Sequence, residues 1–231
     1  MNENTKNQWQ KLDELRRTDP HICGGYYTKN FLKTYRPDFY AEGYDFFPEF
    51  VRVAEKDGEI FCRLEEANVP DEDAPIDSDE CMLETYLGTF VSRDYGEFGG
   101  ALETPGGEIN GNFCDIFEAG GKIYAVDSLS HLGLASTTIY SFDRDCKHHK
   151  VFSAENLDFK ARYATGERAY ILVSGSVSTR SGEKLKSILL EISENGIDAK
   201  TEFDCGFYLV FNMIVKNGKM ILGVDKAVVA A

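Results

Sequence analysis

Four stretches of the chain share one pattern, in which an apolar run meets a Gly-centred turn and returns as a second apolar run. The turn residues are Asp57-Gly58, Gly120-Gly121, Thr165-Gly166 and Asn217-Gly218. These residue types tolerate the positive φ angles of a tight turn, so each stretch is predicted to be a β-hairpin. The four predicted hairpins are residues 50–64, 113–126, 159–173 and 211–224.

Further strands are predicted after the first three hairpins, at residues 86–91, 138–142 and 187–192. The turn glycines of successive hairpins are 63, 45 and 52 residues apart. A hairpin with at least one more strand at this spacing is typical of β-propeller blades. The predicted fold is therefore all-β, with about four hairpin units in a β-propeller-like arrangement. A β-sandwich or an irregular barrel uses the same hairpins and stays open as the alternative.

Residues 1–45 are predicted to form a separate helical and aromatic-rich N-terminal segment, followed by a β domain over residues 46–231. Thr5 and Gln8 have the spacing of a capping box at the start of a short helix, which Pro20 ends. A second short helix is expected from Thr28, with Pro37 closing it.

Two short motifs resemble those of known β-propeller families. GGKIYAV at residues 120–126, followed by TIYSFDRD at residues 138–145, resembles Kelch-type propeller repeats. SRDYGEF at residues 92–98 resembles the Asp-box turn of sialidase-like propellers. Both resemblances imply a propeller fold. Asp boxes are turn-forming structural elements in that family, so the second resemblance implies nothing about catalysis.

The charge of the chain is strongly acidic, with 25 Lys and Arg against 39 Asp and Glu and a net charge of −14. Residues 65–80 carry eight acidic and no basic side chains, and they are predicted to be a solvated acidic loop between two hairpin units. An acidic surface disfavours both nucleic acid and anionic membranes as partners. The longest apolar runs have five residues, far short of the roughly 20 that span a bilayer.

The six cysteines are scattered with no CxxC pair, which favours reduced thiols and a cytoplasmic location. Cys146, His148 and His149 stand close together in residue types that bind zinc, but no second ligand pair is visible. We therefore expect no metal site there and histidines that face solvent. The Gly-rich residues 97–112 are read as a long surface loop.

Aromatic residues are concentrated in residues 26–50, which contain ten of them. With nearby Lys and Arg, such a segment offers a platform for a sugar or a partner peptide. The candidate ligand-binding residues are Tyr26, Tyr27, Tyr35, Arg36 and Tyr40. The alternative is that these side chains pack the N-terminal segment onto the β domain.

No sequence motif of an enzyme stands out. The chain has no GxSxG nucleophile motif and no phosphate-binding loop, and no cofactor is expected. The sequence therefore favours a soluble acidic binding module that recognises a partner through loops of the β domain. This partner is a protein, for which a basic surface would suit the acidic chain, or a ligand such as a sugar. The alternative is a carbohydrate-active enzyme or sugar-binding protein on a propeller-like fold.

Overall fold

A computed structural model describes residues 9–12, 14, 49–66, 79–94, 99–131, 134–179, 182–204, 210–224 and 227–230. Within these residues the protein is all-β, as predicted, and its sheets are antiparallel and open. The chain forms two compact units. Unit 1 combines residues 1–71 with residues 207–231, and unit 2 is residues 72–206. Each unit is described by itself below.

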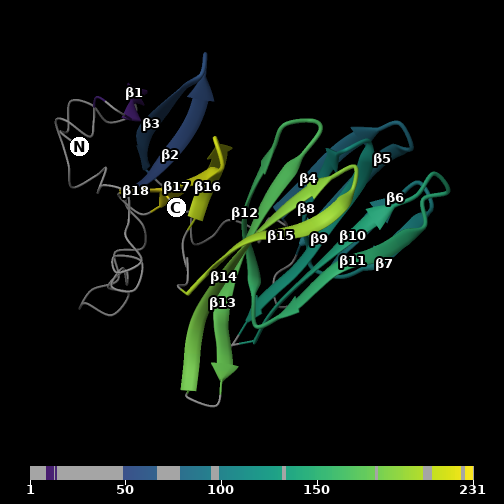
Figure 1. The fold of residues 1–231 in the computed structure, drawn as a ribbon. Helices are drawn as coiled ribbons and strands as arrows, with labels where there is room; N and C mark the ends of the chain where they lie inside the picture. Colours follow the sequence, from purple (N-terminus) through teal and green to yellow (C-terminus); the bar gives the residue numbers. More distant parts are fainter. Residues whose placement is uncertain are drawn as a thin grey trace, which may run out of the picture. The chain divides into compact units, whose positions relative to one another are not determined.

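Unit 2 contains three sheets, each of which is a four-stranded meander with its strands in sequence order (Figure 1). The first sheet is β4 (Asp79–Thr85), β5 (Gly88–Asp94), β6 (Gly100–Thr104) and β7 (Gly107–Asn110). The second is β8 (Phe113–Ala119), β9 (Lys122–His131), β10 (Leu134–Phe142) and β11 (His148–Glu155). The third is β12 (Asp158–Ala164), β13 (Ala169–Thr179), β14 (Gly182–Ser193) and β15 (Gly196–Phe203).

Unit 1 contains two smaller sheets. One has the order β1-β3-β2 and the other the order β16-β17-β18. Their strands are β1 (Gln10–Lys11), β2 (Glu49–Lys56), β3 (Glu59–Glu66), β16 (Val210–Lys216), β17 (Lys219–Val224) and β18 (Ala227–Ala230). The Asn212 side chain joins the two sheets, because its Oδ1 accepts a hydrogen bond from Val53 N at 3.0 Å and its Nδ2 donates to Val53 O.

All four predicted hairpins are confirmed, as β2–β3, β8–β9, β12–β13 and β16–β17. Their turns have the positive φ angles that the residue types indicated, for example 51° at Asp57 and 76° at Gly58. The additional predicted strands also form: residues 138–142 and 187–192 lie within β10 and β14, and the strand predicted at residues 86–91 begins at Gly88 as β5. At these four hairpins, the turn residues visible in the sequence therefore locate the turn between the two strands.

The reading of residues 97–112 as a surface loop is wrong, because strands β6 and β7 form a hairpin there. The Thr104 hydroxyl stabilises its turn by donating to Gly107 O at 2.8 Å and accepting from Gly106 N at 3.1 Å. Thr85 makes the same two bonds in the β4–β5 turn, to Gly88 O and from Leu87 N. A Thr-x-x-Gly sequence thus closes both hairpins.

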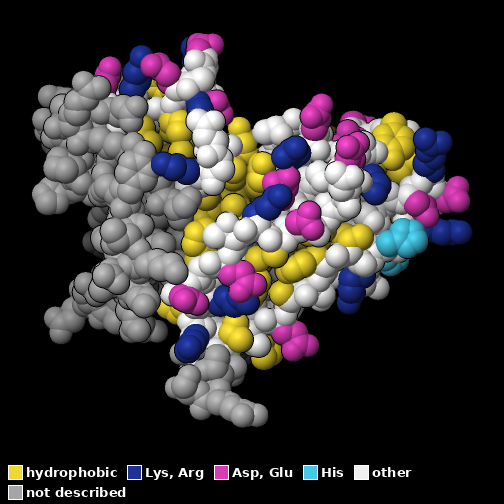
Figure 2. All heavy atoms as spheres, viewed as in Figure 1, with side chains coloured by type: hydrophobic (Ala, Val, Ile, Leu, Met, Phe, Trp, Pro, Cys, Tyr) yellow, Lys and Arg dark blue, Asp and Glu magenta, His cyan; other side chains and the backbone are white. Residues whose placement is uncertain are grey.

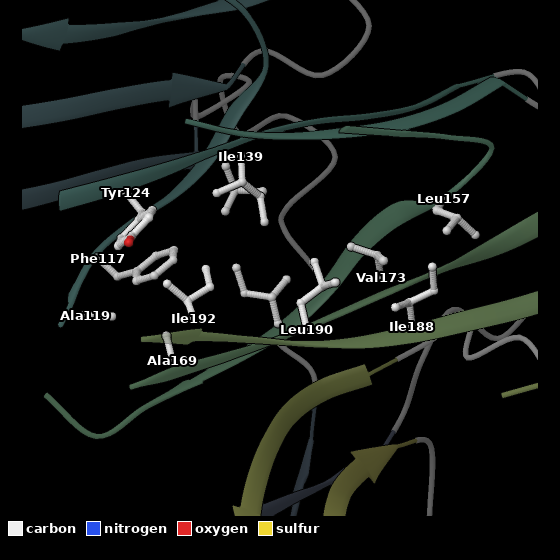
Figure 3. Packing of buried hydrophobic residues seen from close by; sticks show 12 residues of the cluster. Phe117, Ala119, Tyr124, Ile139, Leu157, Ala169, Val173, Ile188, Leu190 and Ile192 are labelled. Atoms are coloured by element: carbon white, nitrogen blue, oxygen red, sulfur yellow. The ribbon is translucent and has the colours of Figure 1, made fainter. Parts of the chain in front are cut away.

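The middle sheet of unit 2, β8–β11, is covered on both faces. On one face Ile123 and Phe142 pack with Phe90 and Leu102 of the first sheet. On the other face Tyr124 and other side chains pack against β12–β15, as Figure 3 shows for residues from both sheets. This double burial explains why β9 begins with the unbroken apolar run at residues 123–126, all of it nearly inaccessible to solvent.

The predicted N-terminal helix is not seen. Gln10 and Lys11 instead form strand β1, paired with Cys62 and Phe61 on β3, so that their backbone groups are satisfied by a sheet edge. Leu12 and Glu14 are the only described residues in helical conformation. In the described part of the chain, no helix has the length and apolar character needed to cross a bilayer. Most of residues 1–45, and residues 67–78 of the predicted acidic loop, lie outside the described residues.

Candidate functional site

Two pockets lie on either side of the Gly120-Gly121 turn, which connects β8 to β9 in unit 2. The first, the Glu191 pocket, has a volume of about 580 Å³. Its charged lining residues are Glu167, Arg168, Glu191, Glu194, Asp198 and Lys200. The second, the Lys122 pocket, has a volume of about 450 Å³. Its polar and aromatic lining residues include Tyr86, Lys122, Asp143, Arg144 and His149.

The meander topology explains why both pockets lie at the same end of unit 2. In a four-stranded meander the first and third connections lie at the same end of the sheet. The linings draw on the β4–β5, β8–β9, β10–β11, β12–β13 and β14–β15 connections, so all three sheets contribute. We call this the turn end of unit 2. The opposite end carries the β13–β14 hairpin, whose residues 175–179 and 182–186 extend past the paired parts of β12 and β15 (Figure 1).

Gly120 allows two of these turns to meet. A Cβ atom at this position would lie 2.4 Å from Glu194 N and 2.8 Å from Glu194 Cα, so only glycine fits against the β14–β15 turn. Its φ of 55° is also one that other residues adopt at a cost. Gly121 has a φ of 72°, but a Cβ there would meet nothing within 4 Å. The close approach at Gly120 therefore forms one wall of the Glu191 pocket.

An ion-pair triad organises the Glu191 pocket. Arg168 Nη1 lies 3.1 Å from Glu191 Oε1, and Lys200 Nζ lies 3.3 Å from Glu191 Oε2. The Glu191 side chain is only 12% exposed, which holds the carboxylate in place between the two cations. A hydrogen bond with Tyr170 and the charge of Glu191 raise the pKa of Arg168 further above its ordinary value, so Arg168 stays charged. Glu194 and Asp198 take part in no ion pair within the described residues.

In the Lys122 pocket the acidic group is engaged by its own loop. Asp143 Oδ1 accepts hydrogen bonds from the backbone N–H groups of Asp145 and Lys147, both at 2.9 Å, and His149 Nε2 donates to Oδ2 at 3.1 Å. The His149 hydrogen bond, together with the backbone bonds, lowers the pKa of Asp143 below its ordinary value. Among the described residues no ion pair includes Lys122 or Arg144, so the pocket presents two cations that are not held by a carboxylate of the protein.

A partly buried ion pair joins the second and third sheets of unit 2. Asp115 on β8 is 8% exposed and accepts two hydrogen bonds from Arg162 on β12, at 2.6 Å from Nε and 3.2 Å from Nη2. The Arg162 guanidinium also lies over the Phe117 ring, 5.0 Å from its centroid. This bidentate contact joins the second sheet to the third. The Glu191 pocket is lined by residues of both sheets, so its shape depends on their packing.

The candidate binding residues from the sequence, Tyr26, Tyr27, Tyr35, Arg36 and Tyr40, all lie outside the described residues, so their role stays a prediction.

The three residues considered as zinc ligands have other contacts. His149 binds Asp143, and His148 lies edge-on to Tyr140 with ring centroids 5.5 Å apart. Cys146 occupies a turn position with a φ of 57°. In the described parts of the chain, no group of three or more His, Cys, Asp or Glu is placed to hold a metal ion.

Sequence reasoning did not identify either pocket, although it named Gly120, Gly121 and Gly166 as turn residues and His149 as a possible zinc ligand. The available signal was the set of Gly-centred turns, because consecutive meanders gather alternate turns at one end. The charged residues beside those turns, such as Glu167-Arg168 and Glu194, were not singled out. On the face shown in Figure 2, acidic and basic side chains are interspersed with exposed hydrophobic ones, so charge alone does not mark the site.

Comparisons of the chain with protein-family models, with curated proteins and with solved structures found no match. The functional argument therefore rests on the geometry of the chain itself.

Proposed function

We propose that this protein is a binding module that recognises a protein partner at the turn end of unit 2. The observation that carries this proposal is the pair of pockets that flank Gly120-Gly121. Turns held by a rigid β scaffold are where binding residues are disproportionately found. The scaffold here is held by two hydrophobic clusters and by the Asp115–Arg162 ion pair.

The charge of the protein supports a partner with basic character. With a net charge of −14, the chain attracts cationic surfaces at long range and speeds their encounter. This attraction weakens as salt shortens the Debye length. A partner that binds in this way associates more slowly at high ionic strength.

The proposal includes a propeller-like scaffold. Four-stranded meanders stacked face to face, as in unit 2, are the building principle of propeller blades. In unit 1 the sheet nearest the N-terminus packs against the sheet nearest the C-terminus through Asn212, which suits a ring of blades. The Kelch-like and Asp-box-like motifs also favour a propeller, and a β-sandwich or irregular barrel is the alternative.

A cytoplasmic location belongs to the same proposal. The four cysteines among the described residues, Cys62, Cys81, Cys114 and Cys146, form no disulfide. Such cysteines agree with a reducing compartment, where disulfides are rare.

The proposal is tested by selecting a random peptide library displayed on phage against the full chain, with a glycan array as the parallel arm. We expect enriched peptides that no longer bind the Glu194→Lys/Asp198→Lys variant but still bind Lys184→Glu. Lys184 is exposed on the β13–β14 hairpin at the opposite end, which makes its charge reversal a matched control.

Two results would overturn the proposal. One is enriched peptides that bind the pocket variants as well as they bind the parent chain. The other is binding of glycans alone, which would favour the carbohydrate-binding alternative, especially if Tyr35→Ala or Tyr40→Ala abolished it.

A further inference from the structure

The two pockets at the turn end have opposite charge. The Glu191 pocket has four carboxylates against two cations, Arg168 and Lys200. The Lys122 pocket has the cations Lys122 and Arg144 against the single carboxylate of Asp143. Both pockets share Gly120 and Gly121 as lining residues, so the change of sign occurs across one hairpin turn.

Contacts within the protein sharpen this difference. Arg168 and Lys200 both point at Glu191 and neutralise it, which leaves Glu194 and Asp198 without an ion-pair partner in the described residues. On the other side Asp143 is engaged by His149 and by two backbone N–H groups. What each pocket offers a ligand is therefore carboxylate on one side and Lys or Arg on the other.

The packing of the sheets sets the distance between the pockets. The Glu191 pocket lies between the second and third sheets of unit 2, and the Lys122 pocket lies between the first and second. Stacked sheets are about 10 Å apart, so the centres of successive gaps between them are separated by about the same distance. A peptide in the extended polyproline II conformation rises about 3.1 Å per residue with three residues per turn, so side chains three residues apart lie on the same side of the peptide and are separated by about this distance.

We infer that the two pockets bind one extended peptide segment, with a basic side chain in the Glu191 pocket and an acidic side chain about three residues away in the Lys122 pocket. This inference rests on the proposed function and adds the chemical class of the ligand. Neither a uniformly basic nor a uniformly acidic segment satisfies both pockets, because one of its charges then meets like charge. Charge order thus provides specificity as well as attraction.

Synthetic peptides with blocked termini test the inference against the full chain by fluorescence anisotropy. The probes share a Gly/Ser/Tyr background and carry Lys-x-x-Glu, Glu-x-x-Lys, Lys-x-x-Lys or Glu-x-x-Glu. We expect one of the two mixed peptides to bind about tenfold more tightly than both uniform ones, and the difference to shrink at high salt.

Charge-reversal variants identify which pocket takes which charge. Glu194→Lys/Asp198→Lys is expected to weaken the preferred mixed peptide about tenfold, as is Lys122→Glu/Arg144→Glu. A chain that carries all four reversals should prefer the peptide of opposite order. This rescue separates a change of charge from a loss of folding, because a misfolded chain would bind neither peptide.

The outcomes separate the inference from the proposed function. If the mixed peptides bind no better than Lys-x-x-Lys, and only reversal in the Glu191 pocket matters, the inference is overturned while the proposed function stands. If the phage selection also yields no peptide that depends on the turn end, the proposed function is overturned with it. Preference for one mixed order, inverted by the fourfold reversal, supports the inference.

Discussion

The contact between the β8–β9 and β14–β15 turns can be tested by adding one methyl group at Gly120. In Gly120→Ala, the new Cβ would lie 2.4 Å from Glu194 N, whereas real Cβ atoms essentially never come closer than 3.0 Å. The backbone of the β14–β15 turn must therefore move. Gly121→Ala is the matched control, since Gly121 also has positive φ but a Cβ there meets no atom within 4 Å.

The magnitudes follow from the two separate costs. Placing alanine at a left-handed φ costs about 1–2 kcal/mol, and this applies to both variants. Forcing a group into occupied space adds about 1–3 kcal/mol, and this applies to Gly120→Ala alone. We expect the free energy of unfolding to fall by about 1–2 kcal/mol in Gly121→Ala and by about 2–5 kcal/mol in Gly120→Ala.

Urea unfolding of the full chain, followed by far-ultraviolet circular dichroism, measures the free energy of unfolding of both variants. The two values are compared with the same dependence of the free energy on urea concentration. If the two variants lose the same stability to within about 0.5 kcal/mol, the two turns are not in contact and the wall of the Glu191 pocket is misplaced. Peptide binding gives a second readout, because Gly120→Ala should weaken binding at the turn end more than Gly121→Ala does.

Three further predictions concern contacts elsewhere. Asp115→Ala should lower the free energy of unfolding by about 3 kcal/mol in urea titrations, because Arg162 then keeps a partly buried charge without its partner. The double variant Asp115→Ala/Arg162→Met should recover part of this loss, because it removes that charge as well. Asn212→Ala should cost about 1–3 kcal/mol in the same assay, since both backbone groups of Val53 lose their bonds. In Asp143→Ala, amide hydrogen exchange should speed up in the β10–β11 connection, where two N–H groups lose their acceptor.

The parent chain should show the same loosening of the β10–β11 connection on acidification. Folding lowers the pKa of Asp143, so its contribution is fully present above the ordinary carboxyl pKa and is lost as the pH falls through the lower folded value. The measured exchange rates are corrected for the intrinsic pH dependence of amide exchange. If the corrected rates in the β10–β11 connection do not change as the pH falls through the pKa of Asp143, the role given to Asp143 is contradicted. For the other two predictions, a loss below about 0.5 kcal/mol would show that the contact contributes nothing to stability.

Local sequence signals were sufficient to predict a hairpin where the turn residues and the apolar strands on both sides of them lie in one short stretch of the chain. The β8–β9 hairpin is one case, because Gly120-Gly121 accepts positive φ and residues 123–126 are apolar on both faces. The β6–β7 hairpin was missed because its short strands contain few apolar residues, among which Leu102 and Ile109 face the core. The helix predicted from Thr5 was not seen because pairing with β3 decides the conformation of Gln10 and Lys11.

The candidate site could not be predicted from local sequence patterns, because its residues are far apart in the sequence. The Asp115–Arg162 pair joins residues 47 positions apart, and the contact of Gly120 with Glu194 spans 74 positions. Neither follows from residue type or spacing, because both depend on which sheets stack and in what order. The charged residues at the turns were visible in the sequence, but their convergence required the stacking of three meanders.

The most direct test of the proposed binding function is to map where a bound peptide contacts the protein. A peptide enriched by the phage selection is titrated into the full chain labelled with nitrogen-15, and the amide chemical shifts of the glycines are followed. We predict that Gly120, Gly121 and Gly166 at the turn end shift in proportion to binding, while Gly175 and Gly182 on the projecting β13–β14 hairpin do not. Shifts confined to Gly175 and Gly182, with the turn-end glycines unchanged, would contradict the proposed function.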